Sequence, residues 1–131
     1  MADAKSDYLE RKDLDHNLGT ATFTKPTAVY AALLTATEDD TGAATEVTGG
    51  SYARKVITFA AAATSSGVST AANTVDLVWT GLPTATLVSV GIFDASTAGN
   101  LLYYAALTAS KSVTSGDGYT ISAGQLVVTE Q

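Results

Sequence analysis

Few residues in this sequence could perform acid–base or nucleophilic chemistry. His16 is the single histidine, it lies in a charged segment, and the chain contains no cysteine. A hydrolytic triad needs a nucleophile, a base and an orienting acid, and the Gly-x-Ser-x-Gly turn that often presents the serine does not occur. Without cysteine there is no thiol nucleophile, thiolate metal site or disulfide. We therefore expect no catalytic residue and interpret His16 as a solvated or interface residue.

Oxygen ligands that could suit a hard cation are grouped in one segment, at Asp39, Asp40, Thr41 and Glu46. Calcium takes several oxygens from a flexible loop, but the spacing here does not match an EF-hand. Charge clusters normally mark solvated segments, so we interpret this one as a soluble acidic loop. Gly49-Gly50 is not followed by the Gly-Lys-Ser/Thr of a phosphate-binding loop. The sequence therefore predicts no metal site and no cofactor.

Aromatic side chains could form a sugar-binding platform, for which Tyr52, Trp79 and Tyr104 are the candidates. At strand spacing, however, most aromatic residues pack in the core or across strands. Tyr103 and Tyr104 are neighbours, so on a strand they point to opposite faces. We expect one of them to pack inward and the other to be exposed or covered by another subunit.

Length and charge narrow the classes of protein further. The chain has 131 residues and a formal net charge of -6, with 13 Asp and Glu against 7 Lys and Arg. This length can bury one core without disulfide or metal support. Phosphate binding needs clustered Lys and Arg, so nucleic acid is not an expected partner. No apolar run reaches the roughly 18 residues of a membrane span, and the charged segment 1–15 is unlike a signal peptide. We expect a soluble protein with no membrane partner.

One helix is predicted, over residues 7–18. Asp7 can act as its N-cap, Glu10 can complete a capping box, and Gly19 is a suitable C-terminal stop. The apolar face is narrow and consists of Tyr8, Leu9, Leu14 and Leu18. Such a helix needs a surface to lie against.

After residue 19 the apolar pattern alternates, which predicts short strands. The predicted strand segments are 27–37, 51–60, 74–80, 86–94, 101–108, 112–113, 118–122 and 125–129. The first is apolar on both faces, and the third places Val75, Leu77 and Trp79 toward the core. Residues 38–50 are acidic and rich in Gly and Thr, which indicates a long exposed loop.

Short strands with Gly-rich turns and no intervening helices are typical of a β-sandwich or small barrel. The predicted fold class is mainly β, an antiparallel β-sandwich of the jelly-roll or immunoglobulin-like type. It has about seven or eight strands and one N-terminal α-helix. Residues 1–19 are expected to form a helical anchor segment and residues 20–131 the β-sandwich domain.

Several segments of the chain form a recognisable set. They are 6–10 (SDYLE), 14–16 (LDH), 26–33 (PTAVYAAL), 45–54 (TEVTGGSYAR), 91–95 (GIFDA) and 99–104 (GNLLYY). Together they resemble a family of short phage virion structural proteins commonly labelled phage tail fiber proteins. The resemblance covers nearly the whole chain.

This resemblance implies a non-enzymatic structural protein of a tailed bacteriophage, a tail-fibre or tail-associated subunit that acts through protein–protein assembly. The implied partners are other phage structural proteins of the tail or capsid, and the implied location is the virion, after synthesis in the host bacterial cytoplasm. A capsid decoration (cement) protein is an alternative of the same class. An alternative of another class is a carbohydrate-binding module for host-surface glycans.

Function through surface contact also suggests a homo-oligomer. We expect the interface on the helix, on the acidic loop and at one strand. The residues are Tyr8, Leu9, Leu14, His16, Leu18, Asp39, Asp40 and Tyr104.

Overall fold

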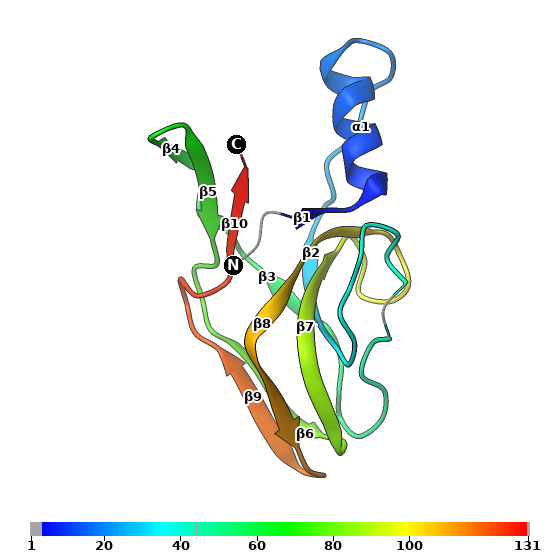
Figure 1. The fold of residues 1–131 in the computed structure, drawn as a ribbon, viewed down its shortest axis with the longest axis vertical. Coiled ribbons are helices and arrows are strands. Elements are labelled where there is room, and N and C mark those ends of the chain that lie inside the picture. The colour runs from blue at the N-terminus through cyan, green and yellow to red at the C-terminus, as the bar shows by residue number, and fades with distance from the viewer. Residues whose placement is uncertain (1–3, 44, 131) are drawn as a thin grey trace.

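The computed structural model describes residues 4–43 and 45–130, which are mainly β with one N-terminal helix (Figure 1). This confirms the predicted class and the position of the helix. The helix α1 spans Asp7–Asn17. The strands are β1 (Ala4–Lys5), β2 (Val29–Leu34), β3 (Lys55–Ile57), β4 (Ala63–Ser65), β5 (Val68–Ala72), β6 (Leu77–Leu82), β7 (Ala85–Phe93), β8 (Leu101–Val113), β9 (Asp117–Ile121) and β10 (Val127–Glu130).

The largest sheet has five antiparallel strands in the order β1-β8-β7-β2-β3. The last four residues of β2 are fully buried. Ala31 and Leu33 belong to the main core, and Ala32 and Leu34 belong to a second, smaller core. Because successive side chains of a strand point to opposite faces, β2 is covered on both sides. This confirms the burial predicted for the segment.

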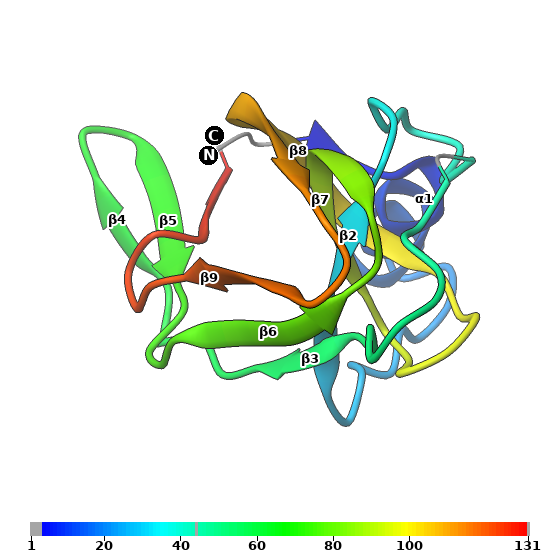
Figure 2. The same ribbon diagram turned by 90° about the horizontal axis from the view of Figure 1, so that it is seen from below.

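A long, bent ribbon of two antiparallel strands forms the rest of the body (Figures 1 and 2). β5 is followed by β6 and β9 by β10, so the pairs β5–β10 and β6–β9 are two halves of the ribbon. Asn73 lies at the bend and is 2% exposed. Its Nδ2 donates to the carbonyls of Val75 (2.9 Å) and Ser122 (3.2 Å), and its Oδ1 accepts from the N–H of Leu126 (2.9 Å). These bonds add to the backbone bond from the Asn73 N–H to the Leu126 carbonyl (3.1 Å) and satisfy polar groups at the bend.

The main core lies between the five-stranded sheet and the β6–β9 half of the ribbon. Leu77, Trp79 and Leu82 enter it from β6, and Ile121 enters it from β9. Trp79 is 1% exposed, and its indole N–H donates to the carbonyl of Ala53 at 3.0 Å. In the other half of the ribbon, Val128 of β10 packs against the edge of this core, and β4 lies on the outer side of β5 (Figure 1).

The predicted number of strands was too low, since the described residues form sheets of five, three and two strands. β4 and β5 were missed because residues 60–72 are mostly Ala, Ser and Thr and have no apolar alternation. β1 has two residues and exists through its pairing with β8. Residues 112–113 belong to β8, because β7 pairs with them directly.

Two side chains also lie elsewhere than predicted. Val75 was assigned to the core but is 54% exposed, because the bend at Asn73 interrupts the alternation before β6 begins. The N-cap of α1 is Ser6 rather than Asp7, since the Ser6 hydroxyl accepts from the N–H of Leu9 at 3.2 Å. Asp7 instead lies in the first turn, where its charge favours the helix dipole.

We predict that Asn73→Ala lowers the free energy of unfolding by about 3 kcal/mol, because three side-chain hydrogen bonds are lost and the N–H of Leu126 is left buried without its acceptor. Urea denaturation followed by tryptophan fluorescence measures the change. Asn17→Ala, at an exposed position of α1, is the matched control and should change stability by less than about 0.5 kcal/mol. Equal stabilities of the two variants would contradict the role of Asn73.

Candidate assembly interface

The helix α1 is fixed to the β domain at its N-terminal end. β1 pairs with β8 immediately before the helix, with Lys5 opposite Tyr103. Ser6 is 2% exposed, its N–H donates to the carbonyl of Leu102 at 2.9 Å, and its hydroxyl donates to the carbonyl of Leu101. The start of the helix is therefore hydrogen-bonded to β8 through β1 and through Ser6.

Lys5 joins the helix to the C-terminal strand. Its Nζ lies 2.6 Å from the Asp13 carboxylate on α1 and 2.7 Å from the Glu130 carboxylate on β10. Glu130 also accepts from the Tyr103 hydroxyl at 2.9 Å. Burial alone would lower the pKa of Lys5, but the hydrogen bonds to both carboxylates outweigh it and raise this pKa above its ordinary value. Lys5 is therefore charged at neutral pH and can pair with both carboxylates.

The C-terminal end of α1, with its C-cap residue Leu18, carries two leucine side chains that the domain leaves uncovered. Leu9 is buried, whereas Leu14 is 60% and Leu18 is 76% exposed. Leu14 and Leu18 are four residues apart and share one face of the helix. Gly19 follows with a φ of +78°, and its N–H donates to the carbonyl of His16, so the predicted C-terminal stop is confirmed.

Tyr8 and His16, two residues of the predicted interface on α1, make contacts within the chain. The Nδ1 of His16 accepts from the N–H of Phe23 at 3.1 Å, which holds the segment that follows the helix. The Nζ of Lys12 lies 5.7 Å from the ring centroid of Tyr8. His16 is exposed and Tyr8 half-buried.

The acidic loop packs against both the helix and β8. The carbonyl of Asp40 accepts from the N–H of Asp7 at 2.9 Å, and its carboxylate accepts from the Tyr104 hydroxyl. Asp39 accepts from the backbone and hydroxyl of Thr41, and these hydrogen bonds lower its pKa. The loop is not exposed throughout, because Glu38 is 4% exposed.

Tyr103 and Tyr104 pack on opposite faces of β8, Tyr103 against the main core and Tyr104 against the smaller one. This confirms the prediction that the two side chains point to opposite faces of the strand. Both hydroxyls are bonded within the chain, Tyr103 to Glu130 and Tyr104 to Asp40. The Asp40 contact, with some help from burial, raises the pKa of Tyr104 to about 12.

The strongest polar cluster was not predicted as a site and is formed by Glu46, Tyr52 and Arg54. The Arg54 guanidinium lies 2.9 Å from Glu46, donates to the carbonyls of Ala95 (2.8 Å) and Ala98 (2.7 Å), and stacks 3.9 Å from the Phe93 ring centroid. The Arg54 side chain is 7% exposed. The cluster therefore joins the 46–54 segment to the turn between β7 and β8.

Tyr52 completes this cluster. Its hydroxyl donates to Glu46 and accepts from the N–H of Leu33 at 3.1 Å. Burial, followed by the hydrogen bond to Glu46, raises the pKa of Tyr52. The sequence signal was the presence of Glu, Tyr and Arg within one short segment, but their contact with residues 93–98 depends on the fold.

Of the three candidates for a sugar-binding platform, Trp79 is buried in the core and presents no ring face for stacking. Tyr52 and Tyr104 are half-buried, and their hydroxyls are bonded to Glu46 and Asp40. Across residues 4–43 and 45–130, no group of three or more His, Asp or Glu side chains could hold a metal ion. No helix in the same part of the chain is long and apolar enough to cross a membrane.

The charged and aromatic side chains described above thus connect segments of the β domain that are distant in the sequence. A family model described as podophage GP4 fiber I protein gp80 matches residues 4–129, and the chain belongs to this family. It is a phage tail-fibre protein, a structural and non-enzymatic component of the virion that assembles with other tail proteins, as the resemblance predicted. No curated protein matches the chain.

We predict that Arg54→Lys lowers the free energy of unfolding by about 3 kcal/mol, because a lysine cannot pair with Glu46 and also reach both carbonyls. Chemical denaturation measures the loss. Lys111→Ala, at an exposed position of β8, is the control and should be near neutral. A loss below about 0.5 kcal/mol in Arg54→Lys would show that the cluster does not hold these segments together.

We predict that Asp40→Asn lowers the pKa of Tyr104 from about 12 toward its ordinary value of about 10. The raised pKa means that the Asp40 contact stabilises the fold below pH ~10 and that this contribution is lost as the pH rises through the folded-state pKa. Tyrosinate absorbance measured during a pH titration, with Tyr104→Phe subtracted, gives the shift. Asp15→Asn removes an exposed charge of α1 and should leave the curve unchanged. An unchanged curve for Asp40→Asn would refute the contact.

Proposed function

We propose that this fibre protein is an assembly subunit that docks onto a neighbouring virion protein through α1. Residues 1–19 are the anchor and residues 20–131 the body in this proposal. The observation that carries it is the apolar pair Leu14 and Leu18, which are 60% and 76% exposed on a helix that extends away from the sheets (Figure 1). Large apolar side chains uncovered on one face of a helix are typical of a docking surface.

The attachment of α1 suits this role. The cap at Ser6 and the Lys5 contacts with Asp13 and Glu130 hold the helix at a fixed angle. An interface that is fixed before binding loses less conformational entropy on assembly. The occupant we propose is an apolar groove on another tail protein, with Tyr8 and His16 at its edge.

The acidic loop and Tyr104 have a supporting role in this proposal. Asp40 bonds both Asp7 and Tyr104, so the loop braces the first turn of α1. Asp39 is exposed beside it and can contact the partner at the rim of the interface. Rim charges contribute more to the rate of association than to affinity.

For the body we propose a two-layer β-sandwich. The five-stranded sheet is one layer and the β6–β9 pair is the beginning of the other, and the shared core between them supports this description. The order β1-β8-β7-β2-β3 is the feature to compare with jelly-roll and immunoglobulin-like domains.

We predict that the double substitution Leu14→Gln and Leu18→Gln weakens binding to tails about 100-fold, because covering each leucine contributes roughly 1.5 kcal/mol. Glutamine preserves helix propensity, so the fold should be retained. The measurement is binding of purified protein to tails and, separately, to capsids, both prepared without it.

The matched control is Val56→Gln with Val78→Gln, since these side chains are 57% and 46% exposed on the body. It should leave tail binding unchanged. Equal binding of the α1 variant and the native protein would refute docking through α1. Binding to capsids alone would replace the tail proposal by a decoration role.

A further inference from the structure

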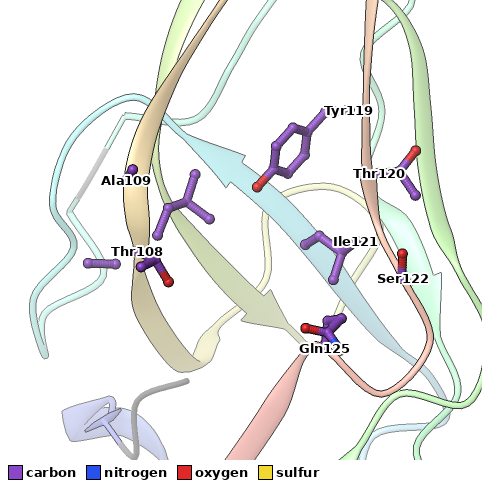
Figure 3. A pocket seen from close by; sticks show the side chains of 9 residues that line it. Thr108, Ala109, Tyr119, Thr120, Ile121, Ser122 and Gln125 are labelled. Atoms are coloured by element: carbon purple, nitrogen blue, oxygen red, sulfur yellow. The ribbon is translucent and has the colours of Figure 1, made fainter.

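A cleft separates β8 and β9, which diverge from the short turn that joins them. It has a volume of about 470 Å³ and is lined by residues 106–109 of β8, residues 119–121 of β9, and Ser122 and Gln125, which follow β9. Tyr119 and Ile121 extend from β9 toward the space, across from β8 (Figure 3). None of the lining residues is charged. A neutral cleft of this kind between two strands suits an uncharged peptide segment.

The strand edges on both sides of the cleft are open. β9 ends its two-stranded sheet and pairs only with β6 among the described residues. On β8, the pairing with β1 ends at Tyr103 and Tyr104, before the cleft begins. The register with β7 shifts from Leu87↔Lys111 to Ser89↔Ala106, so β8 bulges beside the cleft. β9 is therefore the regular edge with backbone groups available for a further strand.

The same chain carries an uncharged edge strand on the β4–β5 hairpin. β4 is the outer strand of its sheet, and all three of its residues are exposed. The hairpin lies away from the main core (Figure 1). Residues 56–75 contain no Asp, Glu, Lys or Arg, although the chain has a net charge of -6. Natural edge strands are usually protected by Lys, Pro or a bulge, and β4 contains neither Lys nor Pro.

We propose that the free edge of β4 in one copy pairs with the free edge of β9 in a second copy, so that the hairpin covers the cleft. Two neutral surfaces meet, and the net negative charges of the copies stay away from the contact. The added strand extends the β6–β9 sheet by main-chain hydrogen bonds. Each copy offers one hairpin and one cleft, so two copies can exchange hairpins reciprocally in a closed dimer, and pairing with successive copies builds a ring or a linear array. This interface does not involve α1 and is independent of the docking proposed above.

The backbone geometry of the hairpin identifies a donor for this pairing. Ser66 and Gly67 have φ values of 52° and 80°, as in a two-residue hairpin turn with positive φ at both positions. Ser65 and Val68 then form the hydrogen-bonded pair next to the turn, and Thr64 and Ser69 form the following non-hydrogen-bonded pair. The N–H of Thr64 therefore points away from β5, toward the open edge.

The test compares Thr64→Pro with Thr64→Ala in the full chain. Proline removes the outward N–H and no β4–β5 ladder bond, while alanine keeps the N–H. Light scattering over increasing protein concentration should give a multi-subunit mass for the native protein and Thr64→Ala. Thr64→Pro should have the mass of one subunit, with a native circular dichroism spectrum. A native protein that stays monomeric at every concentration, or a Thr64→Pro variant that assembles normally, would overturn the proposal.

A cleft-side variant keeps the test decisive if proline disturbs the hairpin. Ala109→Glu places a charge in the cleft at an exposed position, and Ser112→Glu places the same charge on β8 outside it. We expect Ala109→Glu to have the mass of one subunit and Ser112→Glu to have the same multi-subunit mass as the native protein. Mixing Thr64→Pro with Ala109→Glu should restore dimers, because one intact cleft meets one intact hairpin. No dimers in the mixture would overturn the β4–β9 contact, and loss of self-association in the Leu14→Gln, Leu18→Gln protein would assign it to α1.

Discussion

The bend of the two-stranded ribbon is held by one buried amide, that of Asn73. Asn73 supplies both donors and an acceptor to backbone groups at the bend, so no buried polar group there loses its partner. β6 and β9 close the main core, Val128 of β10 packs at its edge, and β5 carries β4 on its outer side.

The few charged residues connect segments that are distant in the sequence. Arg54 joins the segment 46–54 to the β7–β8 turn, and Lys5 joins α1 to β10. Both contacts are partly or largely removed from solvent, where the loss of one partner is costly. Two of the six segments that carry the family resemblance, 45–54 and 91–95, meet at Arg54. The motif is therefore explained by the fold rather than by a reaction.

A fibre protein acts through its surfaces, and two kinds of surface are present here. α1 presents separate apolar side chains on a rigid support, which suits side-chain packing into a groove. β4 and β9 present backbone groups at open edges, which suits strand addition. These surfaces use different chemistry and lie on different elements. The α1 surface can therefore attach the subunit to the tail, while the β4 and β9 edges can join copies of the chain.

The sequence by itself determined the mainly β class, the helix and its stop at Gly19, the doubly buried β2 and the family. These follow from local signals: capping residues, the two-residue alternation and motifs within short segments. Only the tertiary structure decided that Val75 is exposed, that Ser6 caps the helix through its contact with β8, and that Tyr104 bonds Asp40. The small residues 60–72 became a hairpin because β10 pairs with β5. The physical reason is that pairing and bending depend on partners far along the chain, which no local pattern specifies.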